Sequence, residues 1–237
     1  MRKPEAILFD LWGTLINSES FDPARGNAAI LQESGNPRGV TLETVQELGN
    51  RVVTNMERRE DESSLEFTEA SLLRILSDAF DLRFPWSLLE TEWRFWCAAL
   101  EVRIIDGVRE LLPALESLGL PMGVVSNSSF AAATLEKELE RQGIRRHFMF
   151  VISSADYGIR KPDPIIFEVA LRRIGVAPEL AWFAGDNVRY DIEGARGAGL
   201  FPVAFNPRAA IPESVGEHAV ITSWGQLIPL LESATPA

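Results

Sequence analysis

The sequence predicts an α/β protein, a doubly wound parallel sheet with an all-helical domain inserted after its first strand. Two observations support this prediction. Short apolar runs, each ending at polar residues, alternate with segments of helical periodicity over most of the chain. One long segment breaks the alternation and carries helical patterns only. The 237 residues are therefore divided into a core domain, formed by 1–16 and 104–237, and an inserted domain, formed by 17–103.

The first strand is expected at residues 6–9, where four apolar residues lead into Asp10. A run this short, soon followed by a glycine, is typical of a strand buried on both faces of a parallel sheet. Four later runs have the same character. They predict strands at 122–125, 149–152, 180–184 and 202–205.

Helical patterns separate most of these runs and predict the helices that cover the sheet. One runs over 107–118, and another starts after Ser128 and ends before Gly143. A third begins at Asp163-Pro164, because Asp is a favoured N-cap and Pro is favoured at the first helical position. In the inserted domain, helices are expected at 23–34, 42–59, 67–79 and 86–103.

Composition and charge exclude several classes of partner. The net charge of −11 repels phosphate backbones, so nucleic acid is not expected to bind. No apolar stretch reaches the roughly 18 residues of a membrane helix. The single cysteine, Cys97, cannot form an internal disulfide, which favours a cytoplasmic location. A monomer and a homodimer both stay open.

Polar side chains follow the predicted strands at the points where the strands end. Ligands bind at the carboxyl ends of the strands in an open parallel sheet, so these side chains are the candidate site. The set combines three carboxylates, two hydroxyls, an amide and an ammonium. Its members are Asp10, Thr14, Ser126, Asn127, Lys161, Asp186 and Asp191.

This set of groups suits phosphate chemistry. Crowded carboxylates need a cation between them, and oxygen ligands favour Mg²⁺, which also binds phosphate oxygens. Asp10 can attack phosphorus as a nucleophile, and Lys161 can neutralise the charge that develops. Ser126 and the amides that begin the next helix can hold phosphate oxygens. Thr14 and Asn127 are expected to contact a small anionic substrate.

Four segments in order resemble the motifs of the haloacid dehalogenase superfamily. They are FDLWGTL at 9–15, VVSNSS at 124–129, RKPDPIIFEVAL at 160–171 and AGDNVRYDIEGARGAG at 184–199. The helical insert is similar in position to the helical cap of that superfamily, between the first and second motifs. The resemblance covers nearly the whole chain.

The resemblance implies a Rossmann-like core, a helical cap domain, an aspartyl intermediate and a Mg²⁺ cofactor. It also implies the metal ligands, which are the side chains of Asp10 and Asp186 and the backbone carbonyl of Trp12. Asp191 would contact these ligands without binding the metal directly, or would reach the metal through a water molecule.

The chain departs from most phosphatases of this superfamily at Trp12. They carry there a second Asp, which serves as general acid and base. An indole can neither donate nor accept a useful proton, and losing a general acid and base costs about 10²–10⁴ in rate. The metal site survives, because the ligand at this position is a main-chain carbonyl. Rapid hydrolysis of alkyl phosphates with poor leaving groups is therefore not expected, unless the substrate itself or another proton donor assists; a good leaving group would also remove the difficulty.

Three functions follow from these features. The first is a Mg²⁺-dependent phosphatase acting on a small phosphorylated metabolite. The second is a metal-free 2-haloacid dehalogenase, in which an aromatic residue stands at Trp12 and a cap arginine binds substrate; Arg25, Arg38 and Arg51 are candidates. Against it, such enzymes generally lack the Gly-Asp that includes Asp186. The third is a non-catalytic homologue that binds a phosphate ligand or a partner.

Overall fold

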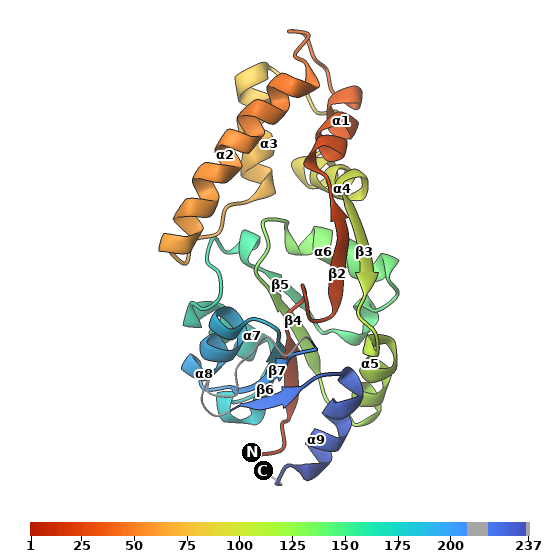
Figure 1. The fold of residues 1–237 in the computed structure, drawn as a ribbon, viewed down its shortest axis with the longest axis vertical. Helices are drawn as coiled ribbons and strands as arrows, with labels where there is room; N and C mark the ends of the chain where they lie inside the picture. The colour runs from red at the N-terminus through yellow and green to blue at the C-terminus, as the bar shows by residue number, and fades with distance from the viewer. Residues whose placement is uncertain (208–217, 236–237) are drawn as a thin grey trace.

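The computed structural model describes residues 1–207 and 218–235 and has a six-stranded parallel sheet at its centre (Figure 1). The strand order is β5-β4-β1-β6-β7-β8, and every neighbouring pair is parallel. The strands are β1 (Ala6–Phe9), β4 (Met122–Ser126), β5 (Val151–Ser153), β6 (Ala181–Gly185), β7 (Phe201–Phe205) and β8 (Ala219–Ile221). The predicted α/β class is confirmed. The edge strand β8 was not predicted.

The strand order brings the ends of three strands together. β1 lies between β4 and β6, with Phe9 level with Val124 on one side and Ala184 on the other. The backbone N–H of Asp10 donates to the carbonyl of Ala184 at 2.9 Å. Residues that follow β4 and β6 therefore flank Asp10 at one edge of the sheet.

Helices cover both faces of the sheet, as doubly wound folds require (Figure 1). Successive residues of a strand point to opposite faces. Ile7 and Phe9 accordingly pack with α5 (Val108–Ser117), α6 (Ala132–Arg141) and α9 (Leu227–Ser233), whereas Ala6 and Leu8 pack with α7 (Pro164–Ile174) and α8 (Gly194–Gly197). Helix α7 begins as predicted, since the Asp163 side chain accepts from the Ile165 N–H at 3.0 Å.

The helical insert, residues 17–103, lies beyond the carboxyl ends of the strands (Figure 1). Its helices α2 and α3 pack around a small apolar cluster of their own, whereas side chains of α1, α3 and α4 join the core of the sheet. Its four helices are α1 (Pro23–Glu33), α2 (Leu42–Glu62), α3 (Glu69–Phe80) and α4 (Leu88–Ala99).

The prediction that this insert contains helices only was wrong at both of its ends. There β2 (Ile16–Phe21) and β3 (Leu100–Ile104) pair antiparallel. The helix expected over 86–103 ends at Ala99, because the backbone of Leu100 is already extended. In 100–104 apolar and charged residues alternate, which is the period of a strand.

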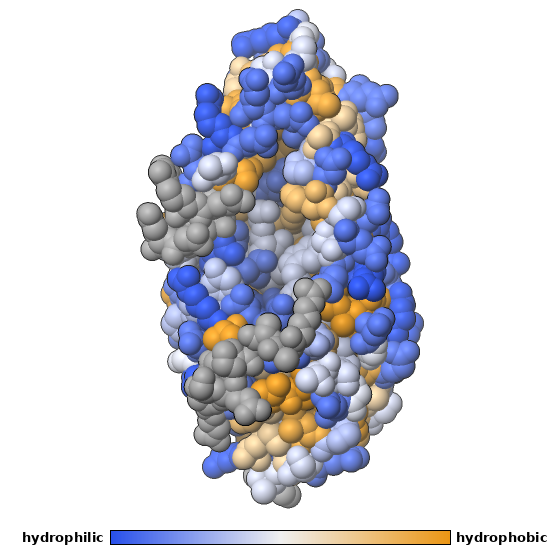
Figure 2. All heavy atoms as spheres, in the orientation of Figure 1, coloured by the Kyte–Doolittle hydropathy of each residue, from blue (hydrophilic) through white to orange (hydrophobic). Residues whose placement is uncertain are grey.

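The visible surface is mostly hydrophilic, with hydrophobic residues in small groups over the upper helices and near the lower end (Figure 2). This distribution is ordinary for a globular chain. None of the helices in the described ranges has the length and apolar character needed to cross a membrane.

Candidate active site

Asp10 follows β1 and is 6% exposed. Its Oδ1 accepts from the Lys161 ammonium at 2.7 Å, and its Oδ2 accepts from the Thr14 hydroxyl at 3.1 Å. Burial raises the pKa of the Asp10 carboxyl to about 7, Lys161 opposes this rise, and Asp191 and Asp186 add to it. Burial therefore disfavours the ionised form of this carboxyl, and the Lys161 ammonium favours it.

Lys161 lies in the loop before α7 and is 1% exposed. Its ammonium contacts Asp10 Oδ1 at 2.7 Å and Asp191 Oδ1 at 2.6 Å. Burial lowers the pKa of this ammonium, but the two carboxylates outweigh burial and raise the pKa above its usual value. The Asn127 side chain fixes the Lys161 backbone, accepting from its N–H at 2.8 Å and donating to its carbonyl at 2.9 Å. Lys161 is thus charged and held in one place.

Asp186 and Asp191 supply two more carboxylates from the segment after β6. Asp191 is buried in a π-helical turn, Val188–Glu193, and accepts from the Asn187 N–H at 2.9 Å. Asp186 is exposed. One oxygen from each of Asp10, Asp186 and Asp191 lies within 4.8 Å of the others. These three side chains form one acidic cluster.

The acidic cluster fits a magnesium ion. Its donors are oxygens only, which is the ligand type that Mg²⁺ prefers. Gly13, with φ of 75°, brings the loop after β1 so close that an added Cβ would lie 2.2 Å from Asp186 Oδ2. The Trp12 carbonyl group is bonded to the Gly13 nitrogen and belongs to the same loop. A glycine at 13 therefore leaves room for the carboxylate beside this backbone.

The Trp12 side chain turns toward the helical insert. Its ring lies 5.6 Å from the Trp96 ring on α4, centroid to centroid, at an angle of 38°. Trp96 is fully buried, and its indole N–H donates to Glu138 Oε2 on α6 at 2.9 Å. Trp12 thus connects the loop of Asp10 with the insert.

A cavity of about 200 Å³ opens beside Asp10. Thr14 and Ser126 are fully buried and do not line it. The Ser126 hydroxyl lies 3.4 Å from the Asn127 carbonyl, to which it donates. The cavity does bring together most of the predicted residues. Its lining consists of Asp10, Trp12, Asn127, Arg160, Lys161, Asp186, Asn187, Tyr190 and Asp191.

Three of these lining residues were not among the predicted site residues: Arg160, Asn187 and Tyr190. A signal was present, because each lies within the third or fourth motif, next to a predicted residue. The cap arginines considered for a dehalogenase lie elsewhere. Arg25 pairs with Glu101 at 3.3 Å, and neither it nor Arg38 nor Arg51 lines the cavity beside Asp10.

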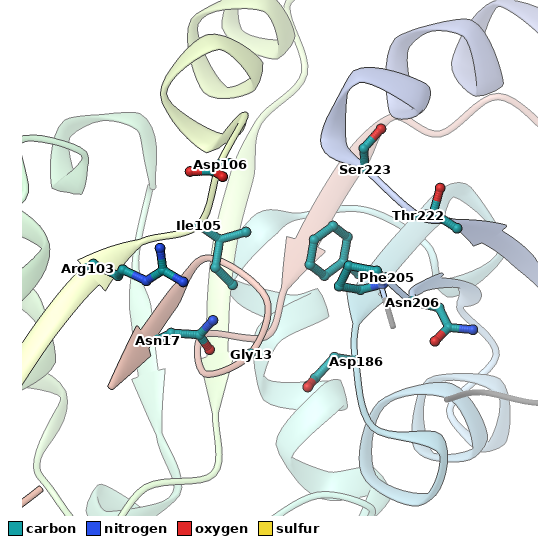
Figure 3. A pocket seen from close by; sticks show the side chains of 11 residues that line it. Gly13, Asn17, Arg103, Ile105, Asp106, Asp186, Phe205, Asn206, Thr222 and Ser223 are labelled. Atoms are coloured by element: carbon teal, nitrogen blue, oxygen red, sulfur yellow. The ribbon is translucent and has the colours of Figure 1, made fainter. Parts of the chain in front are cut away.

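A second cavity, of about 460 Å³, is lined by Gly13 and also by Asp186, which it shares with the cavity beside Asp10. Figure 3 shows Asn17 and Arg103 of the β2–β3 pair on one side of it, and Phe205 and Thr222 on the other. Its lining contains Asp186 but neither Asp10 nor Lys161. The cavity beside Asp10 is therefore the one that holds the reactive groups.

A doubly wound sheet with a buried aspartate, a paired lysine and an acidic cluster at its carboxyl edge defines a class of hydrolases. The chain belongs to the haloacid dehalogenase-like hydrolase family, which matches residues 4–199. The superfamily resemblance of its four motifs is thereby confirmed.

Curated relatives and a solved structure agree with this assignment. The chain is 32% identical to a phosphoglycolate phosphatase of Xanthomonas campestris pv. campestris, over 86% of this chain and 84% of the relative. It is 35% identical to human haloacid dehalogenase-like hydrolase domain-containing protein 3, over 56% of this chain and about half (55%) of the relative. A 2-haloacid dehalogenase from Pseudomonas syringae pv. Tomato DC3000 superposes with a TM-score of 0.67, 26% identity and coverage of 98% and 99%.

Proposed function

We propose that this protein is a Mg²⁺-dependent phosphatase that acts on a small phosphorylated metabolite, with Asp10 as the nucleophile. The observation that carries the proposal is the acidic cluster, in which Asp186 and Asp191 lie within 4.8 Å of Asp10. A single carboxylate nucleophile needs one positive charge to balance its own, and the Lys161 ammonium supplies that charge to Asp10. Two further carboxylates at this place suit a divalent cation. The similarity to a phosphoglycolate phosphatase over most of both chains points the same way.

In the proposed reaction, an oxygen of the Asp10 carboxylate attacks phosphorus and the bond from phosphorus to the leaving oxygen breaks, with its electron pair going to the leaving group. Water then attacks the aspartyl phosphate and releases inorganic phosphate and free Asp10. Lys161 balances charge on Asp10 and on the phosphoryl oxygens. A magnesium ion held by Asp10, Asp186 and the Trp12 carbonyl would neutralise charge on nucleophile and substrate.

Trp12 limits the substrates in this proposal. The ring is occupied by packing against Trp96 and offers no proton to a leaving group. Substrates whose leaving group departs as a stable anion, such as acyl phosphates, should therefore react faster than alkyl phosphates. Helices α1–α4 would form the cap domain over the cavity and exclude water. As a monomer or homodimer, the protein would act in the cytoplasm.

The test measures phosphate release from acetyl phosphate with Mg²⁺, with EDTA, and in an Asp10→Asn variant. We expect EDTA to abolish turnover, added Mg²⁺ to restore it, and Asp10→Asn to lower kcat by about 10⁴-fold or more. Asp106→Asn is a matched control, because this carboxyl lines the second cavity and not the one beside Asp10. Turnover that persists in EDTA or in Asp10→Asn contradicts the mechanism.

Two observations favour a second function, a 2-haloacid dehalogenase. Trp12 places an aromatic ring beside the nucleophile, a halide leaves without a proton, and the Pseudomonas syringae dehalogenase is similar over the whole chain. Chloride release from 2-chloropropionate in EDTA would establish it. A protein that binds Mg²⁺ and turns over neither compound would instead be a non-catalytic homologue.

A further inference from the structure

Arg160 is a cationic side chain in the wall of the cavity beside Asp10. Its side chain is 15% exposed. In the described part of the chain, the cavity is lined by two cationic residues, Lys161 and Arg160. The Lys161 ammonium already contacts two carboxylates, at 2.7 and 2.6 Å. Arg160 is therefore the positive group best placed for a part of the substrate other than the phosphoryl group.

Both the core and the helical insert hold Arg160. Its Nε lies 3.5 Å from Glu66 Oε2, and its guanidinium carbon lies 5.6 Å from the centre of the Tyr190 ring. Its backbone N–H donates to the carbonyl of Ser64 at 3.0 Å. Glu66 is itself fixed, since Oε2 accepts from the Ser154 hydroxyl at 2.6 Å. These contacts restrict the directions in which the guanidinium can point, so binding a ligand there costs little ordering.

The cavity beside Asp10 is also small. At about 200 Å³ it is smaller than the roughly 300–1,000 Å³ of most ligand pockets. The indole of Trp12, packed on Trp96, limits it toward the helical insert. A phosphate group beside Asp10 would occupy much of this volume, so the rest of a substrate held inside the cavity should be short.

From this placement we infer that Arg160 binds a carboxylate on the substrate, so that the substrate is a short phosphate compound with a carboxylate at its other end. The inference rests on the proposed function and names its substrate class. A guanidinium matches a carboxylate with two parallel N–H donors, and such charged pairs are stronger than neutral hydrogen bonds. Because a guanidinium has five N–H groups, it can contact Glu66 and a substrate carboxylate together. Glu66 is then a positioning residue.

Binding of two non-hydrolysable compounds tests this inference without relying on turnover. 3-Phosphonopropionate and propylphosphonate differ only in that the first ends in a carboxylate and the second in a methyl group. Calorimetry in Mg²⁺ should show that the wild-type protein binds 3-phosphonopropionate about tenfold more tightly or better. Arg160→Ala should raise the Kd for 3-phosphonopropionate by about 10- to 100-fold and change the Kd for propylphosphonate by less than about twofold.

Two variants separate charge from geometry. Arg160→Lys keeps the charge but loses the paired donors, so its Kd for 3-phosphonopropionate should lie between those of wild type and Arg160→Ala. Arg189→Ala is the matched control, because this exposed guanidinium is also 5.6 Å from the Tyr190 ring but does not line the cavity. It should leave both Kd values within about twofold.

Glu66→Gln tests the positioning role, because the amide still accepts from Ser154 while the charge beside Arg160 is lost. It should raise the Kd for 3-phosphonopropionate by about three- to tenfold and leave the Kd for propylphosphonate unchanged. The inference would be overturned if the wild-type protein bound the two phosphonates with equal Kd values. It would also be overturned if Arg160→Ala lost the same factor of affinity for both. A carboxylate preference that depends on Arg160, in a protein with no Mg²⁺-dependent turnover, would support it while the proposed phosphatase activity fails.

Discussion

Two groups of buried carboxyls in this molecule are stabilised in different ways. At the sheet edge, Asp10 and Asp191 share the ammonium of Lys161. Between the helical insert and α6, Glu69 and Glu92 are also buried, but within the described residues neither forms an ion pair. Glu92 Oε1 instead accepts from neutral donors, the N–H of Ala131 at 2.9 Å and the hydroxyl of Thr134 at 2.5 Å.

The pKa values reflect this difference. Burial, reinforced by Glu92, raises the pKa of Glu69 to about 8, so this carboxyl is protonated at neutral pH. Burial also raises the pKa of Glu92, against the effect of its hydrogen bonds. The pKa of Asp10 is limited by Lys161 to about 7. A shared cation thus opposes the rise in pKa that burial causes, whereas Glu69, a buried carboxyl without a cation, is protonated at neutral pH and makes stability depend on pH.

Removing the shared cation should have the largest effect. In Lys161→Met, Asp10 and Asp191 lose their counter-charge, so the pKa of Asp10 should rise further and kcat should fall by about 10³-fold. Breaking a buried pair costs about 3–5 kcal/mol, so the free energy of unfolding should fall by about this amount. Urea unfolding and phosphate release measure both effects.

Lys137→Met is the control for that variant, since Lys137 pairs with Glu90 at 3.1 Å at a partly exposed position. Its effect on unfolding should stay below about 1 kcal/mol. If Lys161→Met keeps kcat within tenfold of wild type, the sheet-edge carboxylates do not depend on a shared cation, and the comparison fails.

The second prediction concerns the carboxyl that has no cation. Glu69 has a pKa of about 8 in the folded protein against a usual 4.5, so the native state keeps a proton that the unfolded state releases between these values. The free energy of unfolding should therefore fall as pH rises through this window, by up to about 1.4 kcal/mol per unit, and level off above pH 8. Glu69→Gln, which cannot ionise, should remove this slope.

Urea unfolding of both proteins at several pH values measures the slope. Glu43→Gln is the matched control, because Glu43 also lies in the first turn of a helix but is exposed. It should follow the wild-type curve. Parallel curves for wild type and Glu69→Gln between pH 5 and 8 would show that Glu69 is ionised when buried.

The smallest expected effect concerns the contact that joins the two regions. The Trp12 and Trp96 rings lie 5.6 Å apart, and an aromatic pair contributes about 0.5–1.5 kcal/mol beyond its buried area. A double-mutant cycle with Trp12→Leu and Trp96→Leu should give a coupling energy of this size in urea unfolding. Strictly additive effects would mean that the rings do not link the sheet edge to the insert.

The sequence predicted most of the core because local signals and structure agree there. The strand that ends at Asp10 and the N-cap at Asp163 were found where expected. The β2–β3 pair was missed, because a strand as short as Leu100–Ile104 is stable only beside a partner far away in sequence. Arg160 was missed as a lining residue because its position depends on Glu66 in the insert.

The order of residues alone was enough to predict which polar groups would stand at the carboxyl edge of the sheet, since short apolar runs fix where parallel strands end. The tertiary structure alone decided how those groups pair: Lys161 with both Asp10 and Asp191, and Trp12 with Trp96. The physical reason is that ion pairing, ring contact and pKa depend on burial and on distances of a few ångströms between residues far apart in the chain. Local periodicity carries no information about such distances.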